Sequence, residues 1–239
     1  MQMSSLKDSF LNFCEKNYFE KNKYQLKILD FLIDFLDPKI NFLNFFTKPK
    51  KKLCFYLCGG VGVGKTMILN FVYDFLCIPK QRLHFNEFMI NFHNYRHKMK
   101  NKDNSLSSFV KGLKKYQLIY LDEFQVTNIV DAMILGKLFE TIFNEGIKVI
   151  LTSNTKIDDL YKDGLQREQF LPFISIIKEN STQKELILEE DYRKLGANKL
   201  KRTFYPISEK NIFSINQLFR EFTKNKKNKE RILNIKDRN

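Results

Sequence analysis

The sequence predicts an α/β fold in which helices cover both faces of a parallel sheet. Short apolar runs alternate with stretches of helical periodicity between residues 53 and 190, as expected when crossover helices join parallel strands. The first apolar run leads into a glycine-rich turn and then into a helical run. With 239 residues, 43% of them hydrophobic, the chain can bury one core and carry a smaller second region.

Three regions are expected along the chain. Residues 1–47 supply N-terminal helices that lead into the core, the clearest of them from about Tyr24 to Leu36, ahead of Asp37-Pro38. Residues 48–190 form the core. Their first five residues form a basic turn, which is better interpreted as a solvated loop than as a docking patch for a partner. Residues 191–239 hold one more helix, from about Ser208 to Thr223, and a lysine-rich tail.

The glycine-rich turn has the spacing G-x-x-x-x-G-K-T of a P-loop. It consists of Gly59, Gly60, Val61, Gly62, Val63, Gly64, Lys65 and Thr66. An expected strand, Leu53–Cys58, precedes it, and an expected helix, Met67–Cys77, follows, which is the context that a P-loop requires. The backbone N–H groups and the helix N-terminus favour a polyphosphate, with Lys65 on the terminal phosphates and the Thr66 hydroxyl on Mg²⁺. The alternative is a glycine-rich turn without a ligand, but the flanking strand and helix favour ATP binding.

A second expected strand, Gln117–Glu123, ends in two acidic residues. Ligands of parallel sheets bind at the carboxyl ends of strands. We therefore expect Asp122 to hold Mg²⁺, directly or through water, and Glu123 to orient and polarise the attacking water. The alternative, that these acids cap the next helix, is less favoured because a P-loop stands upstream.

Further strands and helices complete the alternation. A short strand is expected at Arg82–Phe85, helices at Asn86–Lys100 and Asp131–Phe143, and a polar loop at Lys98–Ser108. The strand Lys148–Asn154 has a polar tip, where Asn154 can contact the γ-phosphate or the attacking water. His93 and His97 stand four residues apart, but no third ligand has a matching spacing, so an exposed helix face is the better interpretation.

Composition limits the classes of partner. The formal net charge is +14 with 41 Lys and Arg residues, which by itself favours an anionic partner. Lysine greatly outnumbers arginine, and Asn, Ile, Phe and Tyr are abundant, as in proteins of A/T-rich genomes, so we expect no nucleic-acid partner. The four cysteines show no metal-binding or disulfide pattern. No apolar stretch of membrane-spanning length and no signal peptide is expected, so the prediction is a cytoplasmic protein.

The motifs together resemble those of the ZapE-like AAA+ ATPases of bacteria and their mitochondrial relatives. Matches occur in chain order at Gly59–Thr66, Leu121–Thr127, Asp131–Leu135, Thr152–Asn154, Asp159–Tyr161, Gly164–Ile174 and Asp191–Arg193. D-E-F-Q-V-T and G-L-Q-R-x-x-F-L-P-F-I are much more specific than a P-loop. The similarity begins near Gln25, which matches the last position of the family's D-x-x-Q element.

The resemblance implies a P-loop NTPase of AAA+ type that hydrolyses ATP with Mg²⁺. It implies a protein substrate, with the tubulin-like division protein as one candidate, and a homo-oligomer in full-length relatives. By position, Arg167 would be the arginine finger that reaches the γ-phosphate of the neighbouring subunit and Asn154 would be sensor 1. From the residues alone, Arg167 could equally pair with a surface acid.

The sequence departs from the family at a few positions and in length. The early Asp of D-x-x-Q has no match, and Asn128 and Thr155 stand where relatives usually carry Asp and Arg. Family members extend beyond Asn239, so residues 191–239 are expected to provide only part of the helical lid, and sensor 2 has no assigned residue. Two alternatives to a protein-remodelling ATPase therefore remain open: a nucleic-acid-associated ATPase resembling helicase loaders, and a nucleotide-binding remnant with little turnover.

Overall fold

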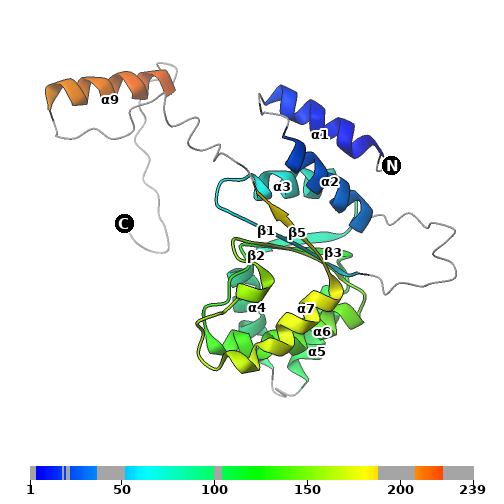
Figure 1. Cartoon of the computed structure of the whole chain (residues 1–239). Helices are drawn as coiled ribbons and strands as arrows, with labels where there is room; N and C mark the ends of the chain where they lie inside the picture. Colours follow the sequence, from blue (N-terminus) through cyan, green and yellow to red (C-terminus); the bar gives the residue numbers. More distant parts are fainter. Residues whose placement is uncertain are drawn as a thin grey trace. The chain divides into compact units, whose positions relative to one another are not determined.

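The chain forms two compact units, Met1–Asp191 and Tyr192–Asn239. The computed structural model describes residues 4–17, 19, 22–36, 52–99, 104–187 and 208–222. The first unit holds the sheet and the helices around it (Figure 1). Several predicted features lie outside the described residues: residues 48–51 of the basic turn, the Asp37-Pro38 helix stop, the Asp191–Arg193 motif and the lysine-rich tail.

A five-stranded sheet lies at the centre of the first unit. Its strands are β1 (Cys54–Gly59), β2 (Lys80–His84), β3 (Leu118–Asp122), β4 (Lys148–Ser153) and β5 (Ser181–Leu186). The order is β2-β3-β4-β1-β5, and every neighbouring pair is parallel. The predicted parallel sheet is confirmed. Strands β1 and β3 are buried along their whole length, as their continuous apolar runs require.

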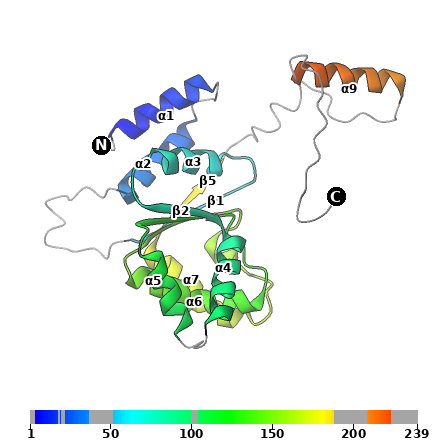
Figure 2. The same cartoon turned by 180° about the vertical axis from the view of Figure 1, so that it is seen from behind.

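Three helices cover one face of the sheet (Figure 1; Figure 2). They are α1 (Ser4–Lys16), α2 (Lys23–Leu36) and α3 (Lys65–Phe75). This cluster buries Phe55 and Leu57 of β1 and Tyr120 of β3. The rings of Phe10 in α1 and Phe71 in α3 pack edge to face, with centroids 5.1 Å apart. The N-terminal helices therefore belong to the same hydrophobic core as the P-loop helix.

Four helices and two short 3₁₀ turns cover the opposite face (Figure 2). They are α4 (Phe85–Lys98), α5 (Ser105–Leu113), α6 (Ile129–Asn144), η2 (Ile157–Asp159), η3 (Arg167–Gln169) and α7 (Leu171–Asn180). The ring of Phe124 is buried at the centre of this layer, 4.4 Å from Phe85 and 5.6 Å from Phe173 between centroids. Cys54 and Cys58 of β1 belong to the same core.

Two predicted boundaries are wrong in this layer. The loop expected at Lys98–Ser108 contains the beginning of α5, which starts at Ser105. That helix forms because Val110 and Leu113 bury their side chains in the core and Phe109 packs against it. Phe85, expected as the last residue of a strand, is instead the first residue of α4 and is buried there.

The second unit contains helix α9 (Glu209–Phe222), close to the expected Ser208–Thr223. Ile212, Phe213, Ile215 and Phe219 are exposed on it. Over the residues that the structure describes, every helix is too short or too polar to traverse a lipid bilayer.

Candidate nucleotide-binding site

The carboxyl ends of β1, β3 and β4 meet at one edge of the sheet because the strands are parallel and in register. Cys58 of β1 pairs with Ser153 of β4, and Leu121 of β3 pairs with Leu151 of β4. The residues that follow these strands are the P-loop, the acidic pair and Asn154. The fold therefore brings together three segments that are distant in the sequence, at the edge where parallel sheets bind ligands.

The P-loop turn depends on glycine at two positions. Gly62 and Gly64 have φ angles of 87° and 89°, a left-handed conformation that costs little only for glycine. At Gly64 space is short as well, because a Cβ there would lie 2.6 Å from Nε2 of Gln25. Gln25 is buried at the start of α2, and its Nε2 donates a hydrogen bond to the carbonyl oxygen of Val63, at 3.2 Å. Helix α2 thus stabilises the P-loop through this hydrogen bond.

Lys65 is the first residue of α3 and is buried. Its Nζ donates hydrogen bonds to the carbonyl oxygens of Gly59 and Gly60, at 2.7 Å each. The same ammonium donates to Oδ1 of Asn154, at 2.9 Å. The lysine of the P-loop and the polar tip of β4 are therefore in direct contact.

Asp122 is buried at the end of β3 and receives hydrogen bonds on both oxygens. Oδ1 accepts from the Thr152 hydroxyl and from the backbone N of Glu123, and Oδ2 accepts from the Arg82 guanidinium at 2.8 Å. Burial alone would raise the pKa of this carboxyl, but the hydrogen bonds from Thr152 and Arg82 outweigh it and lower the pKa. Asp122 is therefore ionised at neutral pH, as a magnesium ligand must be.

Glu123 has an unusual backbone and an exposed side chain. Its φ angle is 54°, and its backbone N donates to the Thr152 hydroxyl at 3.1 Å. Its carboxylate lies 3.8 Å from Nδ1 of His84 and is 78% exposed, so it is open to water. The helix-cap alternative for these acids is wrong, since the N-cap of α6 is Asn128, whose side chain accepts from the backbone N of Asp131.

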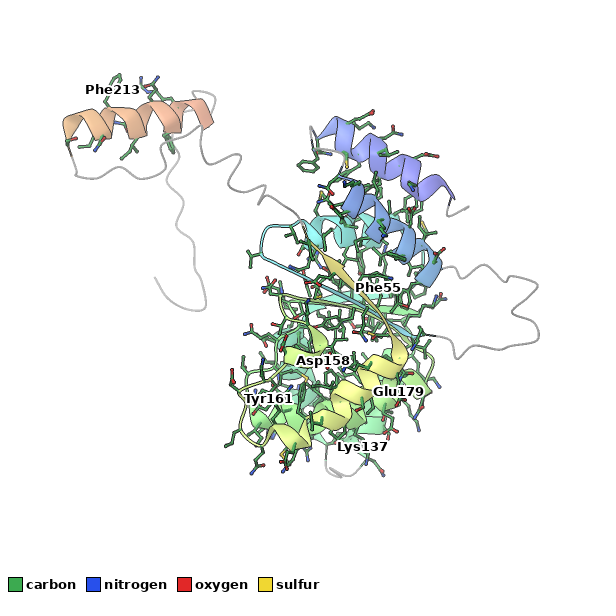
Figure 3. All side chains as sticks on the ribbon, in the orientation of Figure 1. Phe55, Lys137, Asp158, Tyr161, Glu179 and Phe213 are labelled. Carbon is green, nitrogen blue, oxygen red and sulfur yellow. The ribbon has the colours of Figure 1, made fainter. Side chains whose placement is uncertain are left out.

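Arg167 lies on η3, between β4 and α7, away from the contacts made by the other candidate residues. Its guanidinium donates to the backbone oxygen of Asp158, at 2.6 Å. Asp158, which is labelled in Figure 3, in turn forms an ion pair with Lys178 of α7. The described contacts thus join Arg167 to a carbonyl of its own chain, and neither to the P-loop nor to a surface carboxylate.

Three contacts at this edge were not expected from the sequence. Thr152, Arg82 and Gln25 each bind a residue of the site, yet none had been given a role there. Thr152 stands two positions before Asn154 in the T-S-N motif, and Gln25 matches a family element, so both carried a usable signal. Arg82 carried no such signal.

His93, considered above as a metal ligand, lies outside this site. Its Nε2 is 2.7 Å from Oδ1 of Asp131, so its partner is a residue of α6.

The residues at this edge fit a magnesium nucleotide. Thr66 is exposed at the start of α3 and Asp122 is buried at the end of β3, and hydroxyl and carboxylate oxygens are the ligands that Mg²⁺ prefers. The ammonium of Lys65 lies within the loop that wraps a phosphate group in other P-loops. Each group except Arg167 is held at the same edge of the sheet by a strand end or by the start of α3.

Comparisons with known proteins identify relatives of this chain. The chain is 36% identical over 208 residues to lactation elevated protein 1 homolog B of Danio rerio, covering 80% of this chain and 41% of that protein. It is 39% identical over 140 residues to the cell division protein ZapE of Escherichia coli K12, covering 58% and 37%. The chain therefore spans about two fifths of the length of these curated relatives.

A solved structure shows the same fold at low identity. The DnaC helicase loader matches with a TM-score of 0.50 and 16% identity, covering 72% of this chain and 94% of that one. This likeness supports the α/β P-loop fold and nothing more specific. The family model for AFG1-like ATPases matches residues 33–239, and the chain therefore belongs to the AFG1-like ATPase family.

Proposed function

We propose that this chain binds ATP with Mg²⁺ and hydrolyses it, and that hydrolysis is coupled to the remodelling of a protein partner in the cytoplasm. The contact between Nζ of Lys65 and Oδ1 of Asn154 carries the proposal. It joins the residue expected to hold phosphate to the residue expected to sense it. Family membership supports the ATPase class, and the relative ZapE is named a cell division protein, which makes cell division one setting for the protein partner.

Binding requires Lys65 to change partners. Its ammonium now donates to the carbonyl oxygens of Gly59 and Gly60, and it would leave these weaker acceptors for the phosphate oxygens. The freed loop then offers its N–H groups to the same phosphates. The Thr66 hydroxyl and Asp122 would hold Mg²⁺, which neutralises charge on the β- and γ-phosphates when bound.

Turnover would use the groups at the tips of β3 and β4. Glu123 is exposed, so its carboxylate can accept a hydrogen bond from the attacking water and orient it. Asn154, whose oxygen now accepts from Lys65, can donate through its amide nitrogen to the same water or to the γ-phosphate once Lys65 has moved to the phosphates. These residues supply orientation, which together with electrostatic stabilisation accounts for almost all of the catalysis in phosphoryl transfer.

Arg167 would act in an assembly. Its guanidinium is bound to Asp158 within its own chain, so the role of arginine finger requires a second copy whose P-loop approaches it. We propose a homo-oligomer in which Arg167 of one subunit reaches the γ-phosphate bound by the next. Assembly and partner remodelling belong to the full length of the relatives, of which this chain spans about two fifths.

Two substitutions separate binding from turnover. Lys65→Ala should abolish ATP binding in calorimetric titration, because the phosphates lose their cation. Glu123→Gln should bind ATP like the parent and lose at least about 100-fold in steady-state turnover, since the carboxylate acts only on the attacking water. Lys137→Ala, which removes an exposed lysine of α6, is the matched control and should change neither property (Figure 3). Unchanged ATP affinity in Lys65→Ala would remove the P-loop from the proposal.

A further inference from the structure

The pairing of strand β2 with β3 places Arg82 beside the nucleotide site. It lies on β2, one of the two edge strands, in register with Tyr120 of β3. Its guanidinium carbon lies 5.1 Å from the centre of the Tyr120 ring, so both side chains are on the same face of the sheet. Asp122 follows Tyr120 by two positions and therefore points to this face as well.

The contact between Arg82 and Asp122 joins two side chains of different solvent exposure. The side chain of Asp122 is 4% exposed and that of Arg82 is 32% exposed. Oδ1 of Asp122 also accepts from a backbone N–H and from the hydroxyl of Thr152, which is buried in β4. Among these groups, the arginine has the longest side chain and the freest access to solvent, so it is the one that can leave.

A divalent cation at Asp122 cannot coexist easily with this arginine. Both oxygens of the carboxylate already accept hydrogen bonds, and Oδ2 is engaged by the guanidinium. A magnesium ion at Oδ2 would place two like charges on one oxygen in a partly buried site, where repulsion is stronger than in water. A magnesium ion that binds Oδ2 directly therefore competes with Arg82 for this oxygen.

We infer that Arg82 is a resident counterion for Asp122, occupying the carboxylate in the metal-free chain and yielding it when Mg²⁺ enters. Arg82 is then a positioning residue that competes with the metal. It keeps a buried carboxylate paired while the site is empty, since an unpaired buried charge is strongly destabilising. It also weakens magnesium binding by the free energy needed to break the Arg82–Asp122 pair. The inference rests on the proposed function, because it takes Asp122 as a magnesium ligand.

The test is the effect of Mg²⁺ on ADP affinity, measured by calorimetry with no turnover involved. The ratio of the ADP dissociation constant in EDTA to that in saturating Mg²⁺ reports the coupling between metal and nucleotide. In Arg82→Ala this ratio should rise about tenfold, within the range of about 5–150-fold typical of coupled sites. The melting temperature in EDTA should fall by several degrees and recover more on adding Mg²⁺ and ADP than that of the parent does. Arg82→Gln, which keeps a hydrogen-bond donor without the charge, repeats the test if the alanine variant does not fold.

Two controls identify the cause. Arg96→Ala removes a half-buried arginine of α4 and should leave the ratio unchanged. In an Asp122→Asn background the removal of Arg82 should also leave the ratio unchanged, because no carboxylate remains to compete for.

The outcomes distinguish the inference from the proposed function. An unchanged ratio in Arg82→Ala, with a normal response of the parent to Mg²⁺, overturns the inference alone and indicates an ordinary surface pair or a direct phosphate contact. A lower ratio also overturns it and shows that Arg82 helps the metal to bind. If the parent's ADP affinity does not respond to Mg²⁺ at all, the proposed magnesium site fails, and the inference fails with it.

Discussion

Thr152→Val should destabilise the site without disturbing the core. Thr152 is 1% exposed, and its hydroxyl donates to Oδ1 of Asp122 and accepts from the backbone N of Glu123. Valine has nearly the same shape, so the substitution leaves no cavity and removes only the hydroxyl. Asp122 then loses one of the donors that hold its charge in a buried position, and the backbone N of Glu123 keeps only its bond to Asp122.

The expected loss follows from the charge of the acceptor. A hydrogen bond to a charged group contributes about 1.5–3 kcal/mol, so we expect a loss of about 2 kcal/mol in the free energy of unfolding. For a domain of this size that loss lowers the melting temperature by about 4–8 °C. The pKa of Asp122 should also rise toward its ordinary value of 3.8, because Thr152 is the first of the hydrogen-bond donors that lower it.

The pH dependence follows from the direction of that shift. A carboxyl with a lowered pKa in the folded chain adds stability above its unfolded value of 3.8, and the added stability is lost as the pH falls through the folded value. Urea unfolding at several pH values should therefore show the full difference between parent and Thr152→Val near neutral pH. The difference should shrink in acid, below about pH 4.

Thr141→Val is the matched control for this substitution. Its hydroxyl donates to the uncharged carbonyl of Lys137 at the helix surface, so its loss should cost about 0.5 kcal/mol or less. Equal effects of the two valine substitutions at neutral pH would show that Thr152 does not hold Asp122 in place. A difference that persists unchanged in acid would refute the ionic origin of the effect.

Two further predictions concern assembly and charge. If Arg167 acts as an arginine finger, Arg167→Ala should bind ATP normally and lose a factor of about 10³–10⁵ in turnover. Mixing this variant with Lys65→Ala should then restore some activity. No recovery in mixtures shown to co-assemble would argue against action between subunits. Binding to DNA should be weak and should disappear near physiological salt. The logarithm of the binding constant should fall with the logarithm of the salt concentration, with a slope of about 0.9 per phosphate neutralised. Tight binding at that salt, or hydrolysis stimulated by DNA, would favour the helicase-loader alternative.

The strands that carry the P-loop and the acidic pair could be predicted because their signals are local. Leu53–Cys58 and Gln117–Glu123 are uninterrupted apolar runs bounded by turn residues, as fully buried strands require. Strand β5 has no such run. Its burial alternates along Ser181–Leu186, and only its pairing with β1 along its full length identifies it as part of the sheet.

Helix α5 was missed because its polar start hides its apolar face. Asn101 to Ser108 is mostly polar and resembles a loop, while the buried side chains of Val110 and Leu113 come only near the helix end. What makes the segment helical is tertiary packing of Phe109 against Phe92 and Phe88, with centroids 5.2 and 5.7 Å apart. Packing of this kind overrides local propensity and cannot be deduced from a short window.

The contacts around Asp122 could not be predicted for a different reason. Arg82 and Asp122 are 40 residues apart, and their contact depends on β2 being the neighbour of β3. Strand order is a property of the whole sheet, so no motif near either residue indicates it. Arginine in a strand is most often exposed, and a single cation at an edge predicts nothing about its partner.

The end of β4 explains why these groups form one site. β4 lies between β1 and β3 in the sheet. On the β3 side, the Thr152 hydroxyl binds Asp122, and the Ser153 hydroxyl donates to the carbonyl oxygen of Phe124 at 2.8 Å. These bonds fix the acidic pair relative to β4, whatever occupies the nucleotide site.

On the β1 side the same strand end meets the P-loop. Asn154 binds the ammonium of Lys65, and the carbonyl oxygen of Thr155 accepts from the Tyr56 hydroxyl at 2.7 Å. Only the contact with Lys65 must break when phosphate takes the lysine, whereas the bonds to β1 and β3 can persist. Nucleotide binding would therefore free the Asn154 side chain while its backbone stays fixed. A side chain released at a fixed position can report the phosphate to the segment that follows, and that segment leads through Asp158 to Arg167.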